Sequence, residues 1–310
     1  MRLVIPAIFV FALLTNCSRA TPRVPAMPRD SADSIQVGNL QRTYDLHLPT
    51  AYDGSKPTPL VLALHGGGGA GTGMIALTGL NGGADRNDFI VAYPDGIDHH
   101  WNDGRVVNPD VDDVAFISAL IDHLAATLNV DRKRVYATGM SNGGIFSNRL
   151  GCELSGQLAA IAPVAGTLSV NDAARCAPKQ PVSVIAFHGT DDPLVPFNGG
   201  TVRGENIGGI GGEVLAAPDT AARWAKFDGC TGSPTVADLP DVDPGDGTRV
   251  QRETYGTCQG GSAVVLYIIT GGGHAWPGGL PYMPALVIGK TSRDINASQL
   301  IWEFFAAHSR

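Results

Sequence analysis

The sequence predicts an α/β fold in which a mostly parallel sheet is flanked by helices. Short apolar runs that end in Gly, Pro or polar residues alternate along the chain with segments whose apolar residues recur at helical spacing. The central runs are apolar at nearly every position, which is typical of strands that helices cover on both faces. A chain of 310 residues, 44% of them hydrophobic, is long enough to bury one large core. We therefore expect a single folded domain over residues 37–310.

Local patterns predict the individual elements in turn. "RTYDLHLP" (42–49) alternates apolar and polar residues and predicts an early antiparallel strand. Continuous apolar runs predict buried strands at 59–69, 89–96, 134–141, 159–166, 182–192 and 263–274. Helical spacing predicts helices at 112–130, 143–154 and 294–309, with an aspartate cap on the first and Asp294 as the cap of the last. The Gly-rich segment 199–212 predicts a long mobile loop.

The N-terminal residues predict export. The apolar run 3–14 is too short to span a bilayer comfortably and is typical of a secretory signal, which we assign to residues 1–17. "LLTNC" resembles a lipoprotein signal that would make Cys17 the acylated residue, although Asn16 stands where a small residue is usual. A plain cleaved signal is the alternative. Residues 18–36 are rich in Pro, Ser and Ala, which predicts a flexible tether.

Charge and cysteine usage narrow the possible partners. The net charge of −7 offers no polybasic face, which argues against nucleic acid. Apart from Cys17 the cysteines are even in number, as an oxidising compartment favours. They allow three pairings, of which nearness in the chain favours Cys152–Cys176 and Cys230–Cys258. No close Cys-x-x-Cys pair or Cys/His cluster is present, so we expect no metal site.

Polar residues follow three of the predicted strands: Ser141, the pair Asp191/Asp192, and His274. Because sites in open α/β sheets form at the carboxyl ends of strands, we expect these side chains to meet. Ser141 lies in a Gly-x-Ser-x-Gly motif, which a glycine-rich chain can contain by chance. Its place between a strand and a helix points instead to a strained turn that exposes a nucleophile. The order Ser, Asp, His is that of the α/β-hydrolase triad, in which His takes the serine proton and Asp holds the His.

A glycine run offers donors for an oxyanion. In "HGGGG" (65–69) backbone N–H groups are free of side chains, and we expect Gly67 and the N–H of Asn142 to form the oxyanion hole. A phosphate-binding loop is the alternative, but the run lacks the Lys-Ser/Thr ending of a P-loop and the spacing of a dinucleotide fingerprint. His65 and His188 are expected to brace turns by hydrogen bonding rather than to catalyse.

Eight motifs in a fixed order carry a family resemblance. They are "LHGGGG", "YPDG…WNDG", "DDVAFI", "GMSNGG", "APVAG", "HGTDDPLVPFNGG", "GGGHAWPGG" and "IWEFF". Together they resemble the serine esterases that include polyhydroxybutyrate depolymerases and feruloyl or acetylxylan esterases. The resemblance implies an α/β-hydrolase fold with no metal or organic cofactor, Ser141 as nucleophile, His274 as base, and Asp192 rather than Asp191 as acid. It also implies the two cysteine pairs named above.

The sequence therefore predicts a secreted or envelope-tethered serine esterase for hydroxybutyrate oligomers or for feruloyl and acetyl esters of polysaccharide. Trp101, Trp276 and the loop 199–212 are expected to contact substrate because they lie near strand ends, with plain loop packing as the alternative for both tryptophans. Short acyl groups are expected, since no large lid is predicted.

Two other functions compete with the esterase prediction. A peptidase on the same fold would usually need an added cap, for which this chain has little room. A glycan-binding lipoprotein on an inactive scaffold would be expected to lack part of the triad, and all three residues are present. A membrane is expected as a partner only through the possible lipid anchor.

Overall fold

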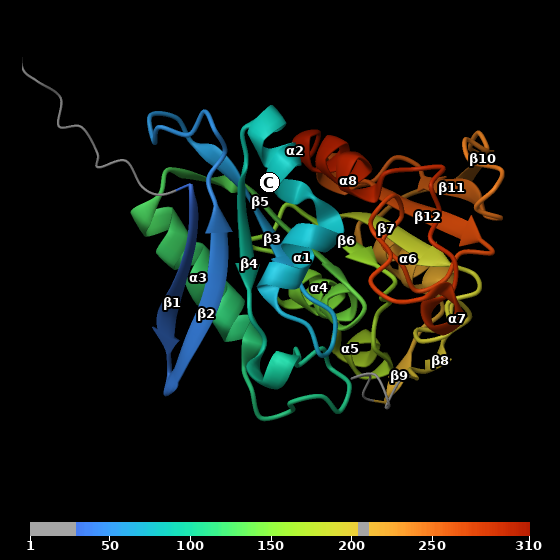
Figure 1. Cartoon of the computed structure of the whole chain (residues 1–310), viewed down its shortest axis with the longest axis horizontal. Coiled ribbons are helices and arrows are strands. Elements are labelled where there is room, and N and C mark those ends of the chain that lie inside the picture. Colours follow the sequence, from blue (N-terminus) through green and yellow to red (C-terminus); the bar gives the residue numbers. More distant parts are fainter. Residues whose placement is uncertain (1–28, 204–210) are drawn as a thin grey trace, which may run out of the picture.

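The computed structural model describes residues 29–203 and 211–310. A ten-stranded sheet runs through its centre, in the order β1-β2-β4-β3-β5-β6-β7-β12-β11-β10 (Figure 1). Its strands are β1 (Asp30–Val37), β2 (Leu40–His47), β3 (Thr58–Leu64), β4 (Ile90–Pro94), β5 (Val130–Met140), β6 (Ala160–Val164), β7 (Ser183–Gly189), β10 (Thr235–Asp238), β11 (Arg249–Tyr255) and β12 (Val264–Thr270). The predicted signal segment 1–17 lies outside the described residues.

The six central strands, from β4 to β12, are parallel, and antiparallel strands flank them on both sides. The helices are α1 (Gly71–Thr78), α2 (Leu80–Asn87), α3 (Asp113–Thr127), α4 (Asn142–Glu153), α5 (Val170–Arg175), α6 (Ala217–Phe227), α7 (Ala285–Ile288) and α8 (Ala297–Ala306). A short ribbon, β8 (Gly200–Thr201) with β9 (Glu213–Val214), joins the two sides of the 199–212 segment. No helix in the described ranges is long and apolar enough to cross a bilayer.

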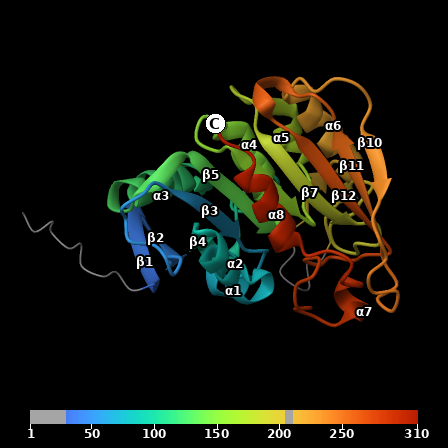
Figure 2. The ribbon, with the colours of Figure 1, turned by 90° about the horizontal axis from the view of Figure 1, so that it is seen from above.

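Helices cover both faces of the sheet, as the turned view makes plain (Figure 2). One hydrophobic core joins α3, α4 and α6 to the sheet, and a second joins α1, α2 and α8 to the opposite face. Strand β3 shows why both exist: Leu60, Leu62 and Leu64 belong to the first core, while Val61 and Ala63 belong to the second. Every residue of β3 is buried, so the predicted buried parallel sheet is confirmed.

Two predictions about the ends of the domain are wrong. The tether prediction extended to residue 36, but residues 30–37 form β1, an edge strand paired antiparallel with β2. Ile35 is the one buried residue of this strand, and the other positions are mostly polar and exposed. The composition of this edge strand is therefore similar to that of a linker. Helix α8 is capped by Asn296, whose side chain accepts a hydrogen bond from Gln299 N, and not by Asp294. Asp294 instead accepts backbone N–H groups of the 242–243 turn.

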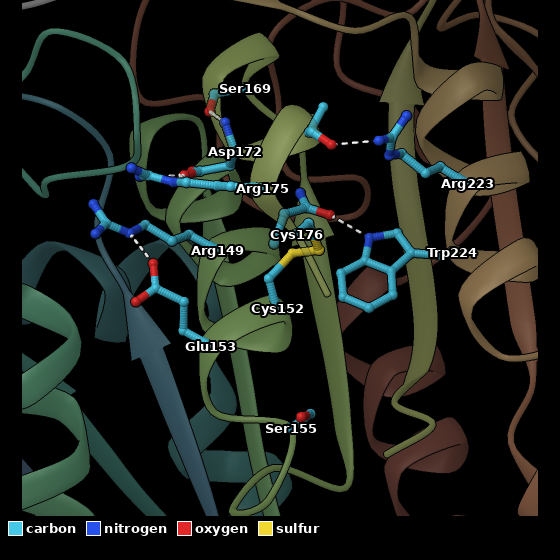
Figure 3. The surroundings of a disulfide bond; sticks show 12 residues. Arg149, Cys152, Glu153, Ser155, Ser169, Asp172, Arg175, Cys176, Arg223 and Trp224 are labelled. Carbon is cyan, nitrogen blue, oxygen red and sulfur yellow. Dashed lines mark hydrogen bonds and ion pairs between the residues drawn. A yellow bond between two sulfur atoms is a disulfide. The ribbon is translucent and has the colours of Figure 1, made fainter. Parts of the chain in front are cut away.

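Both predicted disulfides are present, Cys152–Cys176 and Cys230–Cys258. The first links the end of α4 to the residue that follows α5 (Figure 3). The predicted aspartate cap is also confirmed, because the Asp112 side chain accepts a hydrogen bond from Ala115 N at 2.9 Å at the start of α3.

Candidate active site

Ser141 lies at the turn between β5 and α4 in a backbone conformation that few residues adopt. Its φ of 56° and ψ of −119° lie outside the regions favoured by L-residues. Such strain persists only where the surroundings hold it, and it is concentrated at functional sites. This is the geometry of a nucleophile elbow, which presents the serine hydroxyl above the carboxyl edge of the sheet.

The glycines around Ser141 are required by close backbone contacts. A Cβ on Gly143 would lie 2.3 Å from the carbonyl oxygen of Leu64, and one on Gly139 would lie 2.6 Å from the backbone of Gly143. A Cβ on Gly144 would lie 2.8 Å from the carbonyl oxygen of Val164. Contacts below 3 Å are not tolerated by a real side chain, so the first turn of α4 can approach β3 and β6 only without side chains.

Asp192 and His274 meet in the loops that follow β7 and β12. The His274 ring nitrogen Nδ1 lies 2.8 Å from Asp192 Oδ2, and both side chains are almost fully buried. The other carboxylate oxygen, Oδ1, accepts the backbone N–H groups of Leu194 and Val195 at 2.8 and 2.9 Å. Asp191 is exposed, and among the described residues its side chain bonds only to Thr190. The structure thus brings Asp192, not Asp191, to the histidine.

Backbone contacts hold these two loops together. Asp191 N donates to Gly272 O at 2.9 Å, and Gly271 N donates to the Thr190 hydroxyl at 2.9 Å. A Cβ on Gly189 would lie 2.2 Å from Gly272 O, so the glycines before His274 allow the loops to touch. His274 N donates to Ile288 O, which ties the histidine to α7.

The electrostatics keep Asp192 ionised and His188 neutral. Burial alone would raise the pKa of the Asp192 carboxyl, but the charge and hydrogen bond of His274 outweigh it and lower this pKa. His188 lies 3.5 Å from the same carboxylate, but burial lowers its pKa. Its Nε2 donates to the carbonyl oxygen of Val195 at 2.9 Å. His188 therefore braces the acid loop, as expected.

Gly67 and Asn142 have N–H groups available at the pocket. Among the described residues, neither N–H donates any of the backbone hydrogen bonds that lie outside the helices and strands. Asn142 is the first residue of α4, where N–H groups have no partner within the helix. Its side chain accepts from Trp101 N and donates to Trp101 O, and it also donates to Asp103 Oδ2 at 2.6 Å. This amide clamp fixes the residue that follows Ser141.

A cavity of about 280 Å³ brings together Ser141, His274, Gly67 and Asn142, whereas Asp192 does not line it. It is lined by His65, Gly66, Gly67, Gly68, Gly69, Ala70, Gly73, Met74, Leu77, His100, Arg105, Met140, Ser141, Asn142, Leu194, Val202, Arg203, His274, Tyr282 and Met283. Ser141, His274 and Gly67 therefore face a common space in which an ester could lie.

The predicted substrate contacts of Trp101 and Trp276 are corrected by the structure. Trp101 is fully buried, and its indole N–H donates to His65 O. Trp276 is also buried, and its indole N–H donates to the Ser298 hydroxyl. Neither lines the cavity, so the packing alternative holds. His65 braces its turn as expected, accepting from Gly96 N at Nε2 and donating from Nδ1 to its neighbour's carbonyl.

Two residues near the site, Asp103 and Tyr282, were missed by the sequence analysis. Asp103 has a fully buried side chain that bonds both Arg105 and Asn142. Tyr282 lines the cavity and donates its hydroxyl to His274 O at 3.3 Å. The only signal for Asp103 was its place in the motif "WNDG", and nothing in the sequence singled out Tyr282.

Comparison with known proteins decides the family. The model of the family described as Phospholipase/Carboxylesterase matches residues 49–207, just over half of the chain. The chain is also 34% identical over 284 residues to NocK of Nocardia uniformis subsp. tsuyamanensis, whose name classes it as an esterase; the match covers 88% of this chain and 82% of that protein. The chain belongs to the phospholipase/carboxylesterase family.

Other relatives agree with this family. The esterase is 30% identical over 273 residues to Feruloyl esterase C of Emericella nidulans, covering 86% of this chain and 84% of that protein. It is 36% identical over 241 residues to Feruloyl esterase B of Piromyces equi, covering 73% of this chain but only 41% of that protein. The family identifies this chain as a carboxylic ester hydrolase, as the sequence predicted.

The fold of this esterase is also found in solved structures. The acetyl xylan esterase from Aspergillus awamori superposes with a TM-score of 0.61 at 14% identity, covering 89% of this chain and 99% of that one. The predicted α/β-hydrolase fold is confirmed.

Proposed function

We propose that this esterase hydrolyses its substrates through an acyl-enzyme formed on Ser141. The hydrogen bond between His274 Nδ1 and Asp192 Oδ2 carries this proposal. An ionised Asp192 holds the proton on Nδ1, which leaves Nε2 of His274 free to accept the serine proton. The same Nε2 then delivers that proton to the leaving alcohol. Water, activated by His274, finally releases the acid and restores Ser141.

We propose Gly67 and Asn142 as the donors of the oxyanion hole. As the tetrahedral intermediate forms, negative charge moves onto the former carbonyl oxygen and needs donors that are already in place. The free N–H groups of these two residues and the cavity that they share with Ser141 support this assignment. The clamp on the Asn142 side chain keeps its N–H from turning away.

For the substrate we propose esters with a short aliphatic or a flat phenolic acyl group. Relatives named feruloyl esterase and a structural neighbour named acetyl xylan esterase support polysaccharide-linked feruloyl or acetyl esters, and hydroxybutyrate oligomers remain within the proposal. The cavity is slightly smaller than the ~300–1,000 Å³ typical of sites that bury a drug-sized ligand. Its apolar walls, among them Met74, Leu77 and Met283, suit a small acyl group rather than a long chain.

We propose export from the cytoplasm, because two disulfides persist best in an oxidising compartment. We further propose that Cys17 is acylated and anchors the exported protein to a membrane. The mass of the mature N-terminal peptide tests it, since a diacylglycerol-modified Cys17 at the new N-terminus would support anchoring and an unmodified or absent Cys17 would refute it.

A hydrolysis panel tests the substrate proposal. Purified enzyme is assayed with p-nitrophenyl esters of increasing chain length, methyl ferulate, acetylated xylo-oligosaccharides and hydroxybutyrate oligomers, with a Ser141→Ala variant as the blank. We expect hydrolysis of acetyl to butyryl esters and of at least one of the natural classes. Activity confined to peptide bonds, or an equal rate in the blank, would overturn the proposal.

A further inference from the structure

Two arginines line the cavity of a protein whose net charge is −7. They are Arg105 and Arg203, and among the described residues no aspartate or glutamate lines the cavity. An arginine at the cavity whose charge is not matched by a carboxylate would favour a substrate that carries negative charge.

The two arginines of the cavity differ in what surrounds them. Arg105 is buried and held by Asp103, with Nη2 at 2.6 Å and Nε at 3.0 Å from Asp103 Oδ2. It also donates to Gly211 O at 3.1 Å. Its charge is therefore matched by a buried carboxylate, and its role is to hold the loop beside Asn142.

Arg203 has no such partner. Its side chain is exposed, and within the described residues it forms no ion pair and no side-chain hydrogen bond. Its backbone is nevertheless fixed: Arg203 N donates to Leu194 O at 2.8 Å, and Val202 N donates to Gly212 O at 2.9 Å. Leu194 in turn donates to Asp192, so Arg203 is tied directly to the loop that holds the proposed acid.

We propose that Arg203 binds a carboxylate that the substrate carries away from the ester being cleaved. The inference rests on the proposed function. A guanidinium matches a carboxylate with two parallel hydrogen bonds, and it remains charged at every physiological pH. Both proposed substrate classes can present this group: a hydroxybutyrate oligomer ends in a free carboxylate, and a polysaccharide ester can neighbour a uronate.

The test compares matched acidic and neutral substrates. One arm uses the hydroxybutyrate trimer as free acid and as methyl ester, and the other uses acetylated xylo-oligosaccharides with and without a glucuronate branch. For each pair the ratio of kcat/KM, acidic over neutral, is measured in wild type, Arg203→Gln and Arg203→Lys. Arg252→Gln is the control, since Arg252 is exposed on β11, unpaired among the described residues and absent from the cavity lining.

We expect Arg203→Gln to lower the ratio by about three- to fivefold in at least one arm, the size that an exposed ion pair supports. The lower kcat/KM for the acidic substrate should come from a higher KM and not from a lower kcat, because the contact with Arg203 exists equally in the bound substrate and in the transition state. Arg203→Lys should restore part of the lost ratio. In the wild type, 0.5 M NaCl should lower the ratio, because salt screens the interaction between the two charges. The responding arm identifies the source of the carboxylate.

An unchanged ratio in both arms of Arg203→Gln, or an equal fall in Arg252→Gln, would overturn the inference. The neutral substrates separate this failure from a failure of the proposed function. If the wild type hydrolyses neither neutral substrate, the proposed substrate classes are wrong, whereas hydrolysis with an unchanged ratio refutes only the role of Arg203.

Discussion

Replacing Asp192 by Asn should nearly abolish turnover while leaving the site in place. An asparagine side chain can keep its oxygen on the two N–H groups of Leu194 and Val195, which Asp192 Oδ1 now accepts. Its NH₂ group then replaces Oδ2 and faces His274 Nδ1 at about the present 2.8 Å. Because two donors cannot share a hydrogen bond, the histidine must place its proton on Nε2. That nitrogen can then no longer accept the serine proton.

The size of this effect follows from the loss of the correct tautomer. In a serine triad it is about 10⁴ in kcat, or about 5.5 kcal/mol of transition-state stabilisation. The assay is steady-state hydrolysis of p-nitrophenyl butyrate, with thermal unfolding to confirm that the variant is folded. Asp191→Asn is the matched control, because Asp191 is exposed and its side chain accepts a hydrogen bond from Thr190 rather than from His274. We expect less than about a twofold change, as is usual for surface substitutions.

Two results would refute this reasoning. If Asp192→Asn keeps more than a tenth of the wild-type kcat, the carboxylate does not set the histidine tautomer. If Asp191→Asn proves the more damaging change, the acid has been assigned to the wrong residue.

Four further predictions follow from the same structure. Ser141→Ala should lower kcat by on the order of 10⁶ and leave the melting temperature within a few degrees, measured by kinetics and calorimetry. Replacing either cystine by two serines should cost about 3–4 kcal/mol of unfolding free energy in urea titrations, since the linked cysteines are 24 and 28 residues apart. Hydrolysis should fall steeply from C4 to C16 p-nitrophenyl esters kept monomeric. Burial raises the pKa of Asp228 to about 6, so Asp228→Asn should gain stability over wild type between pH 4 and pH 7, by up to ~3 kcal/mol.

The sign of the last prediction follows from where the proton is bound. Below pH 4 the Asp228 carboxyl is protonated in both the folded and the unfolded chain, so burial costs nothing extra. Between the ordinary pKa of an aspartate and a pH of about 6, the carboxyl ionises in the unfolded chain but stays mostly protonated in the folded one. The unfolded state of the wild type is therefore favoured increasingly as the pH rises through this range. The backbone N–H of Val182, which now donates to Asp228 Oδ1, can donate equally to an asparagine oxygen.

Each of these predictions has a clear contradicting outcome. Appreciable turnover by Ser141→Ala would contradict the first, and free thiols at the four cysteines of the wild type would contradict the second. Faster cleavage of a C16 than of a C4 ester would contradict the third. An Asp228→Asn stability difference that does not vary with pH would contradict the fourth.

The fold and the residues of the proposed triad could be predicted because their signals are local and strong. Each central strand is a continuous apolar run, and Ser141, Asp192 and His274 lie in the turn or loop that follows β5, β7 and β12, respectively. The choice between Asp191 and Asp192 did not come from periodicity, since both follow the same strand; it came from the family resemblance, and the His274 contact agrees with it.

Other features depend on contacts between distant segments and left little trace in the sequence. Trp101 and Trp276 stand near strand ends, but their indole N–H groups find partners in the interior, at His65 O and Ser298, and turn both rings away from the cavity. Strand β1 has the composition of a tether because, as an edge strand, it buries few of its residues. Arg203, unpaired within the part of the chain that the structure describes, could be recognised only once the cavity and its other arginine were seen together.

Labelling with a fluorophosphonate tests the central claim most directly, because this reagent phosphonylates only a serine that a neighbouring base has activated. Intact-mass spectrometry of the wild-type enzyme should show one adduct per chain, and peptide mapping should place it on Ser141. The adduct should be absent from Ser141→Ala and form far more slowly in Asp192→Asn. A folded wild type that stays unlabelled, or an adduct on another residue, would contradict the assignment of Ser141 as the nucleophile.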